Sequence, residues 1–178
     1  NYTAHCSSSG WADPSFVNSH VSALSNANKY PLMVGNCCLS NKFDTDDCFG
    51  ETLLMAADKG ALGYVGGSNN TYWDEDFWWG VGYESISANP TYNPTNLGAY
   101  DRTFHDNGEP TSEWYATQGQ MPSAGNLAIT QAGSSLETYY WEIYHLMGDP
   151  SLMIYFTQPP ITAASYNALM PLSTTTFT

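Results

Sequence analysis

Positively charged residues are scarce in this sequence. Lys and Arg together number four in 178 residues, against 17 Asp and Glu, which gives a formal net charge of −13. A surface that binds nucleic acid or an anionic membrane needs clustered Lys and Arg to neutralise phosphates. The composition therefore argues against both partners and favours cationic peptides or metal ions.

The sequence also lacks long apolar runs and a zinc pattern of cysteines. No stretch approaches the roughly 20 apolar residues that cross a bilayer. The four cysteines are Cys6, Cys37, Cys38 and Cys48, and they contain no paired C-x-x-C. Cys37 and Cys38 would point to opposite sides of an extended strand end, so we expect one packed and one exposed. The even cysteine count leaves disulfides open.

Short apolar runs alternate with helical patterns along the chain. Such alternation predicts an α/β protein with a mostly parallel sheet and helices on its faces. Residues 89–119, rich in Pro, Asn, Gly and Thr, are predicted to form a long surface excursion. We expect strands over 2–4, 31–35, 61–66 and 151–155, and helices over 16–24, 49–59 (capped by Gly60), 125–132 and 136–146.

His5 and Cys38 each follow a predicted strand. The carboxyl ends of parallel strands meet at one edge of a sheet, where ligands bind, so the two side chains are expected at the same rim. A cysteine nucleophile needs a neighbouring base such as imidazole. The ordinary alternative is a structural histidine and a small buried cysteine.

Several segments together resemble the gingipain family of cysteine peptidases, most closely its lysine-specific members. The match is collinear from residue 1 to about 155 and keeps the family's spacing from His5 to Cys38. It is carried by residues 1–5, 11–14, 35–38, 48–51, 72–73, 75–76, 124–128, 139–142, 144–145 and 148–149.

The resemblance implies a caspase-like three-layer fold and a secreted or cell-surface bacterial cysteine endopeptidase made as a zymogen. Residues 1–157 would be the C-terminal part of its catalytic domain, and residues 158–178 a linker or the start of an Ig-like module. The N-terminal part of that domain, on the same or a separately processed chain, would be a partner and would carry the acid that orients His5. Protein substrates and no organic cofactor are implied.

The resemblance also assigns catalytic roles. Cys38 matches the nucleophile and His5 the catalytic histidine, with the backbone N–H groups of Cys6 and Cys38 forming the oxyanion hole. The family has glycine where this chain has Cys6, which puts catalytic efficiency in doubt. Cys6 would then be a reactive thiol, or a disulfide partner of Cys38 that switches the enzyme off.

The predicted specificity pocket lies in the aromatic and acidic segment after residue 71. By resemblance, Thr3 lines the pocket, Trp73 covers the stem of a substrate lysine, and Asp76 lies at the base. A single carboxylate suits the point charge of an ammonium, whereas a guanidinium prefers a planar bidentate partner. The alternative is that residues 74–76 form a solvated charged surface.

A second acidic cluster, over residues 44–51, suits calcium, which takes oxygen ligands. The family binds calcium, so we expect it here with Glu51 and the carbonyl of Phe43 as ligands. The alternative is a solvated loop that favours the positive end of the following helix.

Three functions remain open: a peptidase cleaving after Lys, an Arg-directed or relaxed peptidase, and a catalytically degenerate homologue that acts as a binding or adhesion module. The remaining histidines, His20, His105 and His145, lack a partner at useful spacing and are expected to be structural.

Overall fold

The computed structural model describes residues 1–44, 46–156, 163 and 165. Within these residues, a four-stranded sheet has the order β1-β5-β6-β7, in which β1, β5 and β6 are parallel and β7 is antiparallel at the edge. The strands are β1 (Tyr2–Thr3), β5 (Leu32–Asn36), β6 (Gly63–Gly67) and β7 (Tyr144–Gly148). The predicted α/β class with a mostly parallel sheet is confirmed.

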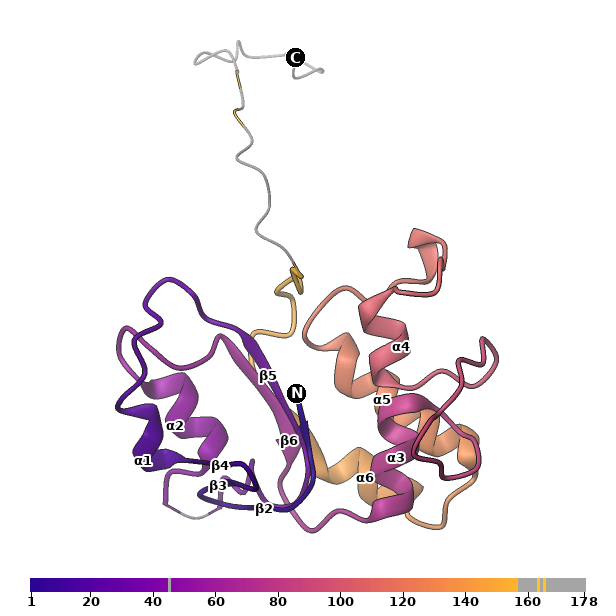
Figure 1. The fold of residues 1–178 in the computed structure, drawn as a ribbon, viewed down its shortest axis with the longest axis horizontal. Coiled ribbons are helices and arrows are strands. Elements are labelled where there is room, and N and C mark those ends of the chain that lie inside the picture. Colours follow the sequence, from indigo (N-terminus) through magenta and orange to yellow (C-terminus); the bar gives the residue numbers. More distant parts are fainter. Residues whose placement is uncertain (45, 157–162, 164, 166–178) are drawn as a thin grey trace, which may run out of the picture.

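Helices cover both faces of this sheet and make three layers (Figure 1). One side carries α1 (Asn18–Val21) and α2 (Phe49–Met55), and the other carries α3 (Trp73–Val81), α4 (Ala99–Phe104), α5 (Gln120–Ala132) and α6 (Glu137–Ile143). Side chains alternate along a strand, and here Tyr64 packs into the core beside α2 while Val65 packs into the core beside α3 and α5. Both faces are apolar because both are covered.

A small antiparallel sheet precedes α1 and was not predicted. It consists of β2 (Cys6–Ser7), β3 (Gly10–Ala12) and β4 (Ser15–Val17). The helix expected over 16–24 is therefore wrong for its first residues and is reduced to α1. Aromatic packing explains the extended start, because the Phe16 ring meets the Trp11 ring at 5.6 Å and the Phe49 ring at 5.4 Å between centroids.

Two predicted helices are shorter than expected. The one predicted over 49–59 ends at Met55, and the chain turns so that the Ala61 amide donates to the Leu53 carbonyl at 3.1 Å. The one predicted over 136–146 ends at Ile143, where the same apolar run continues as β7. A helical period and a strand alternation both fit that run. Hydrogen bonding to β6 makes its second part a strand.

Residues 89–119 are more than the predicted surface excursion. They contain α4 and a short 3-10 helix, η1 (Thr111–Glu113), and Ala99 and Thr103 are buried. The strand predicted over 151–155 is wrong, because only an isolated bridge joins Met153 to Thr117. The predicted linker over 158–178 lies outside the described residues apart from 163 and 165. In the described part of the chain, no helix has the length and apolarity needed to cross a membrane.

Candidate active site

The first two strands bring His5 and Cys38 to the same edge of the sheet. Strand β1 pairs in parallel with β5, with Tyr2 opposite Gly35 and Thr3 opposite Asn36, so the two segments leave the sheet side by side. His5 and Cys38 each lie two residues beyond the end of their strand. Their side chains line one pocket of about 70 Å³, together with Ala4, Thr71, Trp73 and Asp76.

Cys38 is half-buried, and its sulfur makes polar contacts with Thr71. The Thr71 amide donates to Sγ at 3.3 Å, and the Thr71 hydroxyl lies 3.6 Å from it. This donor comes from the loop after β6, which lies beside β5 in the sheet.

The His5 ring is exposed, and its backbone is fixed. Its carbonyl oxygen accepts hydrogen bonds from the Tyr2 hydroxyl at 2.9 Å and the Ala12 amide at 3.0 Å. The ring meets the Trp73 ring edge-on, with 5.2 Å between centroids. Among the described residues, neither ring nitrogen of His5 has a hydrogen-bond partner. No carboxylate in this part of the chain therefore orients the imidazole.

A disulfide joins Cys6 to Cys37, with 5.6 Å between their Cα atoms. The expectation that Cys6 is a reactive thiol or a partner of Cys38 is therefore wrong, and Cys38 and Cys48 are the free cysteines of the described chain. Cys37 is fully buried and Cys38 is half-buried, as the alternation at a strand end predicts.

The Cys6 amide points away from the small sheet. Cys6 faces Trp11, and the Ala12 amide donates to the His5 carbonyl one position along the ladder. Hydrogen-bonded and non-hydrogen-bonded pairs alternate in an antiparallel ladder, so the Cys6–Trp11 pair makes no bonds across it. The Cys6 N–H is therefore directed away from β3, and it bonds to no acceptor in the described structure.

Asp76 is buried on α3 at the inner side of the pocket, with 7% of its surface exposed. Oδ2 accepts a hydrogen bond from the Thr71 hydroxyl at 2.6 Å, while Oδ1 accepts from the hydroxyls of Tyr144 at 2.8 Å and Tyr140 at 3.1 Å. Burial outweighs these hydrogen bonds and raises the pKa of Asp76 to about 6. The group is thus a carboxylate near neutral pH and becomes neutral in mild acid.

The alternative prediction that residues 74–76 form a solvated charged surface is wrong, because two of the three side chains are buried. Only Asp74 is exposed, and Glu75 is buried and accepts a hydrogen bond from Ser134 at 2.6 Å.

Comparison with known proteins fits this geometry. The model for peptidase family C25 matches residues 1–155.

The chain belongs to peptidase family C25.

Among its relatives is Lys-gingipain of Porphyromonas gingivalis strain ATCC 33277, 41% identical over 179 residues, which cover 96% of this chain and 10% of that protein. Lys-gingipain W83 of the same species matches at the same identity and coverage. The chain therefore spans about a tenth of the length of these relatives.

Solved structures agree with the family. A structure described as a protease matches with a TM-score of 0.83 and 39% identity over 96% of this chain and 38% of that one. The Arg-specific cysteine proteinase gingipain R matches with a TM-score of 0.66 at 20% identity, over 86% of this chain and 32% of that one. The second match supports the fold alone, and it confirms the predicted caspase-like three-layer architecture.

In this C25 chain, two of the three predicted specificity residues, Trp73 and Asp76, line the pocket. Trp73 lines the pocket and leaves 64% of its surface exposed, as an open wall would. Thr3 does not line the pocket, and its hydroxyl lies 3.4 Å from that of Tyr100. Sequence reasoning missed Thr71, Tyr140 and Tyr144. No local pattern shows that the hydroxyls of Tyr140 and Tyr144, some 65 positions away, reach Asp76.

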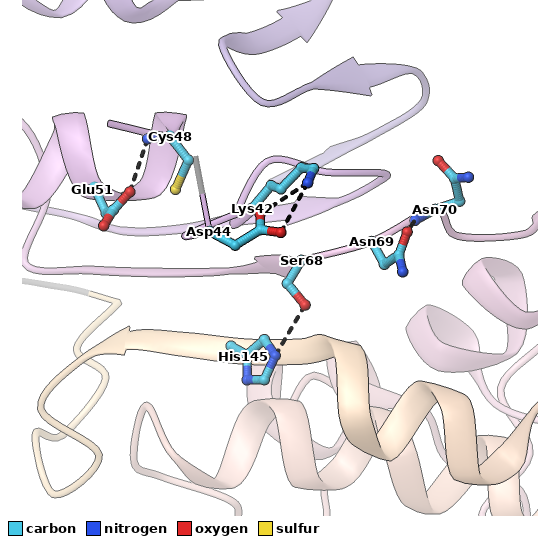
Figure 2. Close-up of polar contacts among 8 residues, drawn as sticks. All are labelled: Lys42, Asp44, Cys48, Glu51, Ser68, Asn69, Asn70 and His145. Atoms are coloured by element: carbon cyan, nitrogen blue, oxygen red, sulfur yellow. Dashed lines mark hydrogen bonds and ion pairs between the residues drawn. The ribbon is translucent and has the colours of Figure 1, made fainter. Parts of the chain in front are cut away.

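The predicted calcium ligands lie in a different region, shown in Figure 2. Glu51 turns back to the start of α2 and accepts a hydrogen bond from the Cys48 amide at 2.9 Å, while Asp44 turns to Lys42 and forms an ion pair at 2.9 Å. Among the described residues, no three His, Cys, Asp or Glu side chains converge as metal ligands. The Phe43 carbonyl and Glu51 remain as predicted ligands, and the ammonium beside Asp44 disfavours a cation at that carboxylate.

The other histidines have partners within the fold. His145 contacts the Ser68 hydroxyl at 3.1 Å (Figure 2), and the His105 ring stacks on Trp114 with 4.1 Å between centroids. The His20 ring nitrogen lies 3.4 Å from the Val17 amide, which donates to it.

Proposed function

We propose that this chain is the C-terminal part of the catalytic domain of a cysteine endopeptidase that cleaves after lysine. Cys38 is the nucleophile and His5 its proton-transfer partner. The observation that carries the proposal is one pocket lined by a thiol, an imidazole and a buried carboxylate. Relationship to Lys-gingipain at 41% identity supports it.

The proposed reaction uses these groups in sequence. His5 takes the Cys38 proton, and the thiolate, which the Thr71 amide stabilises, attacks the scissile carbonyl. The backbone N–H groups of Cys6 and Cys38 receive the negative charge that develops on the carbonyl oxygen. His5 then protonates the leaving amine, and water resolves the acyl-enzyme with His5 as base.

Lysine suits the pocket better than arginine. The aliphatic stem would lie against Trp73, and the ammonium would pair with Asp76. Both oxygens of Asp76 already accept hydrogen bonds from hydroxyls, which leaves few lone pairs for a two-pronged guanidinium. An Arg-directed or relaxed enzyme is the second candidate, because the open Trp73 wall admits a longer side chain.

Labelling tests the nucleophile. In the complete mature protein, a lysyl chloromethylketone should modify wild type and a Cys48→Ala variant and leave Cys38→Ala unmodified, as read by mass spectrometry. Cys48 is the matched control because it is also a free cysteine. Labelling of Cys38→Ala would remove Cys38 from the mechanism, and a wild type that neither labels nor hydrolyses basic substrates would favour the degenerate binding module.

Substitutions of Asp76 and of the nearby Asp74 test the proposed preference for lysine. Asp76→Asn should lower kcat/KM on Lys peptides by at least about a hundredfold, since a buried ammonium would lose its counter-charge. Asp74→Asn, at an exposed position two residues away, should change it less than about twofold. A peptide library with Lys or Arg before the cleaved bond separates the two candidates. Equal turnover by both variants would remove Asp76 from the pocket.

The remaining parts of the proposal concern the whole protein. We expect a secreted bacterial zymogen in which the N-terminal part of the domain supplies the acid for His5, and in which residues 158–178 lead into an Ig-like module. Structural calcium held by the Phe43 carbonyl and Glu51 completes the proposal. Calcium should raise the unfolding temperature of wild type over that in a chelator, and it should do so less in Glu51→Gln.

A further inference from the structure

The disulfide between Cys6 and Cys37 joins the immediate chain neighbours of both residues of the proposed dyad. Cys6 follows His5 in sequence, and Cys37 precedes Cys38. Both cysteines lie beyond the last paired residues of β1 and β5, Thr3 and Asn36, where the hydrogen bonds of the main sheet have ended. The covalent bond therefore continues the connection between these two segments past the edge of the sheet.

The two linked segments differ in how deeply they are buried. The Cys37 side is well fixed, since Cys37 is fully buried and the Leu39 amide donates to the Asn69 carbonyl at 3.0 Å. The His5 side carries an exposed ring and continues into the small sheet that begins with β2. The disulfide ties this less buried segment to the buried one.

The disulfide also holds the backbone amides proposed for the oxyanion hole. The Cys6 N–H points away from β3, and the Cys6 side chain is held by Cys37, whose neighbour Cys38 carries the other proposed oxyanion donor. Donors to an oxyanion act best when they are held in place before the reaction. One cross-link thus fixes two amides, an imidazole-bearing residue and a thiol-bearing residue relative to one another.

We propose that Cys6 and Cys37 are positioning residues: their disulfide holds the His5 and Cys6 segment against the Cys38 segment and so pre-organises the reacting groups. This inference rests on the proposed function. It assigns a role to Cys6, the position at which the resemblance to the family breaks, since glycine there could form no such link.

The test uses the complete mature protein, with a Cys6→Ala/Cys37→Ala double variant and Cys48→Ala as control. Peptide mapping should first find Cys6 joined to Cys37 in wild type. At a temperature where every variant is folded, the double variant should lose between about tenfold and a hundredfold in kcat on a Lys peptide, as misplaced reacting groups do. KM should change less than about twofold, because Trp73 and Asp76 lie on α3 and outside the linked segments.

A second readout separates positioning from stability. The pH profile of Cys38 alkylation by iodoacetamide should move toward that of an unassisted thiol in the double variant and stay unchanged in Cys48→Ala. A lower unfolding temperature with unchanged kcat and unchanged alkylation profile would overturn the inference and leave an ordinary structural cross-link. Mapping of Cys6 to Cys38 would overturn it as well.

If the double variant fails to fold, reduction of the Cys6–Cys37 disulfide in wild type tests the same inference. Dithiothreitol supplies two electrons and two protons to the disulfide and is itself oxidised to its cyclic disulfide. Activity should fall as two additional thiols become alkylatable, and full activity with both thiols exposed would contradict the inference. Failure of the proposed function is distinguishable, because then either wild type would hydrolyse no basic substrate or Cys38→Ala would retain the activity, whatever the state of the disulfide.

Discussion

Asp76 is the residue whose chemistry depends most on where the fold places it. Its folded-state pKa of about 6 exceeds the ordinary value of 3.8 because burial disfavours the charge. As pH falls through about 6 the carboxyl gains a proton and loses the charge that would pair with an ammonium. We expect the Kd of a lysine-ended peptide for the inactive Cys38→Ala protein to rise about tenfold per pH unit below that point, measured by calorimetry.

The control for this pH dependence is the same titration in Cys38→Ala/Asp76→Asn. That protein should bind the peptide weakly and with little change across the same range. A change in Kd near pH 6 that persists without the carboxyl would show that a group other than Asp76 controls the binding.

Thr71 joins the proposed nucleophile to the proposed specificity carboxylate. Its amide donates to the Cys38 sulfur, and its hydroxyl donates to Asp76, which lowers the pKa of that carboxyl. Thr71→Val keeps the amide and the shape and removes the hydroxyl. The pKa of Asp76 should therefore rise further above its ordinary value, and the pH midpoint for lysine binding should move up in the same calorimetric titration.

Thr71→Ser is the matched control, because it restores the hydroxyl. Its midpoint should stay within about 0.3 pH units of wild type. A Val variant with the wild-type midpoint would show that this hydrogen bond does not set the charge of Asp76.

At this scale the sequence marks His5, Cys38 and Asp76, each by a strand end or by a segment that resembles the family, and all three line one pocket in the structure. It could not predict that Asp76 is held by Thr71, Tyr140 and Tyr144. The Tyr144 contact depends on the antiparallel pairing of β7 with β6, which brings residues far apart in the chain together. The same limit applies to the disulfide, since four cysteines allow several pairings.

Helix α5 is the element that sets the position of α3, which carries Trp73 and Asp76. Gly125 of α5 lies against the buried Trp79 of α3, and a Cβ there would overlap the Trp79 ring. The Trp79 indole also donates to Asn126 at 3.2 Å and stacks on Tyr144 with 4.8 Å between ring centroids. Close packing at Gly125 therefore holds α3, and with it Trp73 and Asp76, against α5.

Gly125→Ala should lower the free energy of unfolding by about 1–3 kcal/mol, as overpacking of a core does. It should also raise the KM for Lys peptides, because a displaced Trp79 moves α3. Denaturant unfolding and steady-state kinetics measure the two effects. Leu127→Ala, on the same helix with 42% of its side chain exposed, is the control and should change stability by less than about 1 kcal/mol. A Gly125→Ala protein as stable as wild type would show that the interface has room.

Local patterns predicted β1, β5 and β6 but missed β7, which begins inside the helix predicted over 136–146. Residues 136–146 illustrate the reason: Leu136, Tyr140 and Ile143 fit one face of a helix, while Tyr144 and Leu146 fit a strand alternation. Only the long-range pairing of Val65 with Leu146 decides between them. That pairing is a property of the sheet, and no window of neighbouring residues contains it.

Over the whole chain, the charge is strongly negative, and the few basic groups are largely engaged. Lys42 pairs with Asp44, the Lys59 ammonium donates to the Ser22 carbonyl at 2.8 Å, and Arg102 lies over the Tyr115 ring at 5.2 Å from its centroid. A net charge of −13 creates a field that attracts cationic molecules from a distance. The field reaches about 10 Å at 0.1 M salt and about 3 Å at 1 M.

We therefore expect salt to slow the capture of a Lys- and Arg-rich protein substrate. Its kcat/KM should fall about tenfold between roughly 0.02 and 0.5 M NaCl, whereas that of a short peptide with a single Lys should fall less than about threefold. An Asp58→Asn/Glu142→Gln variant, changed at two exposed acids, should show a shallower slope for the protein substrate only. Parallel slopes for both substrates would instead place the salt effect at the Asp76 contact, since that local pair acts on every lysine alike.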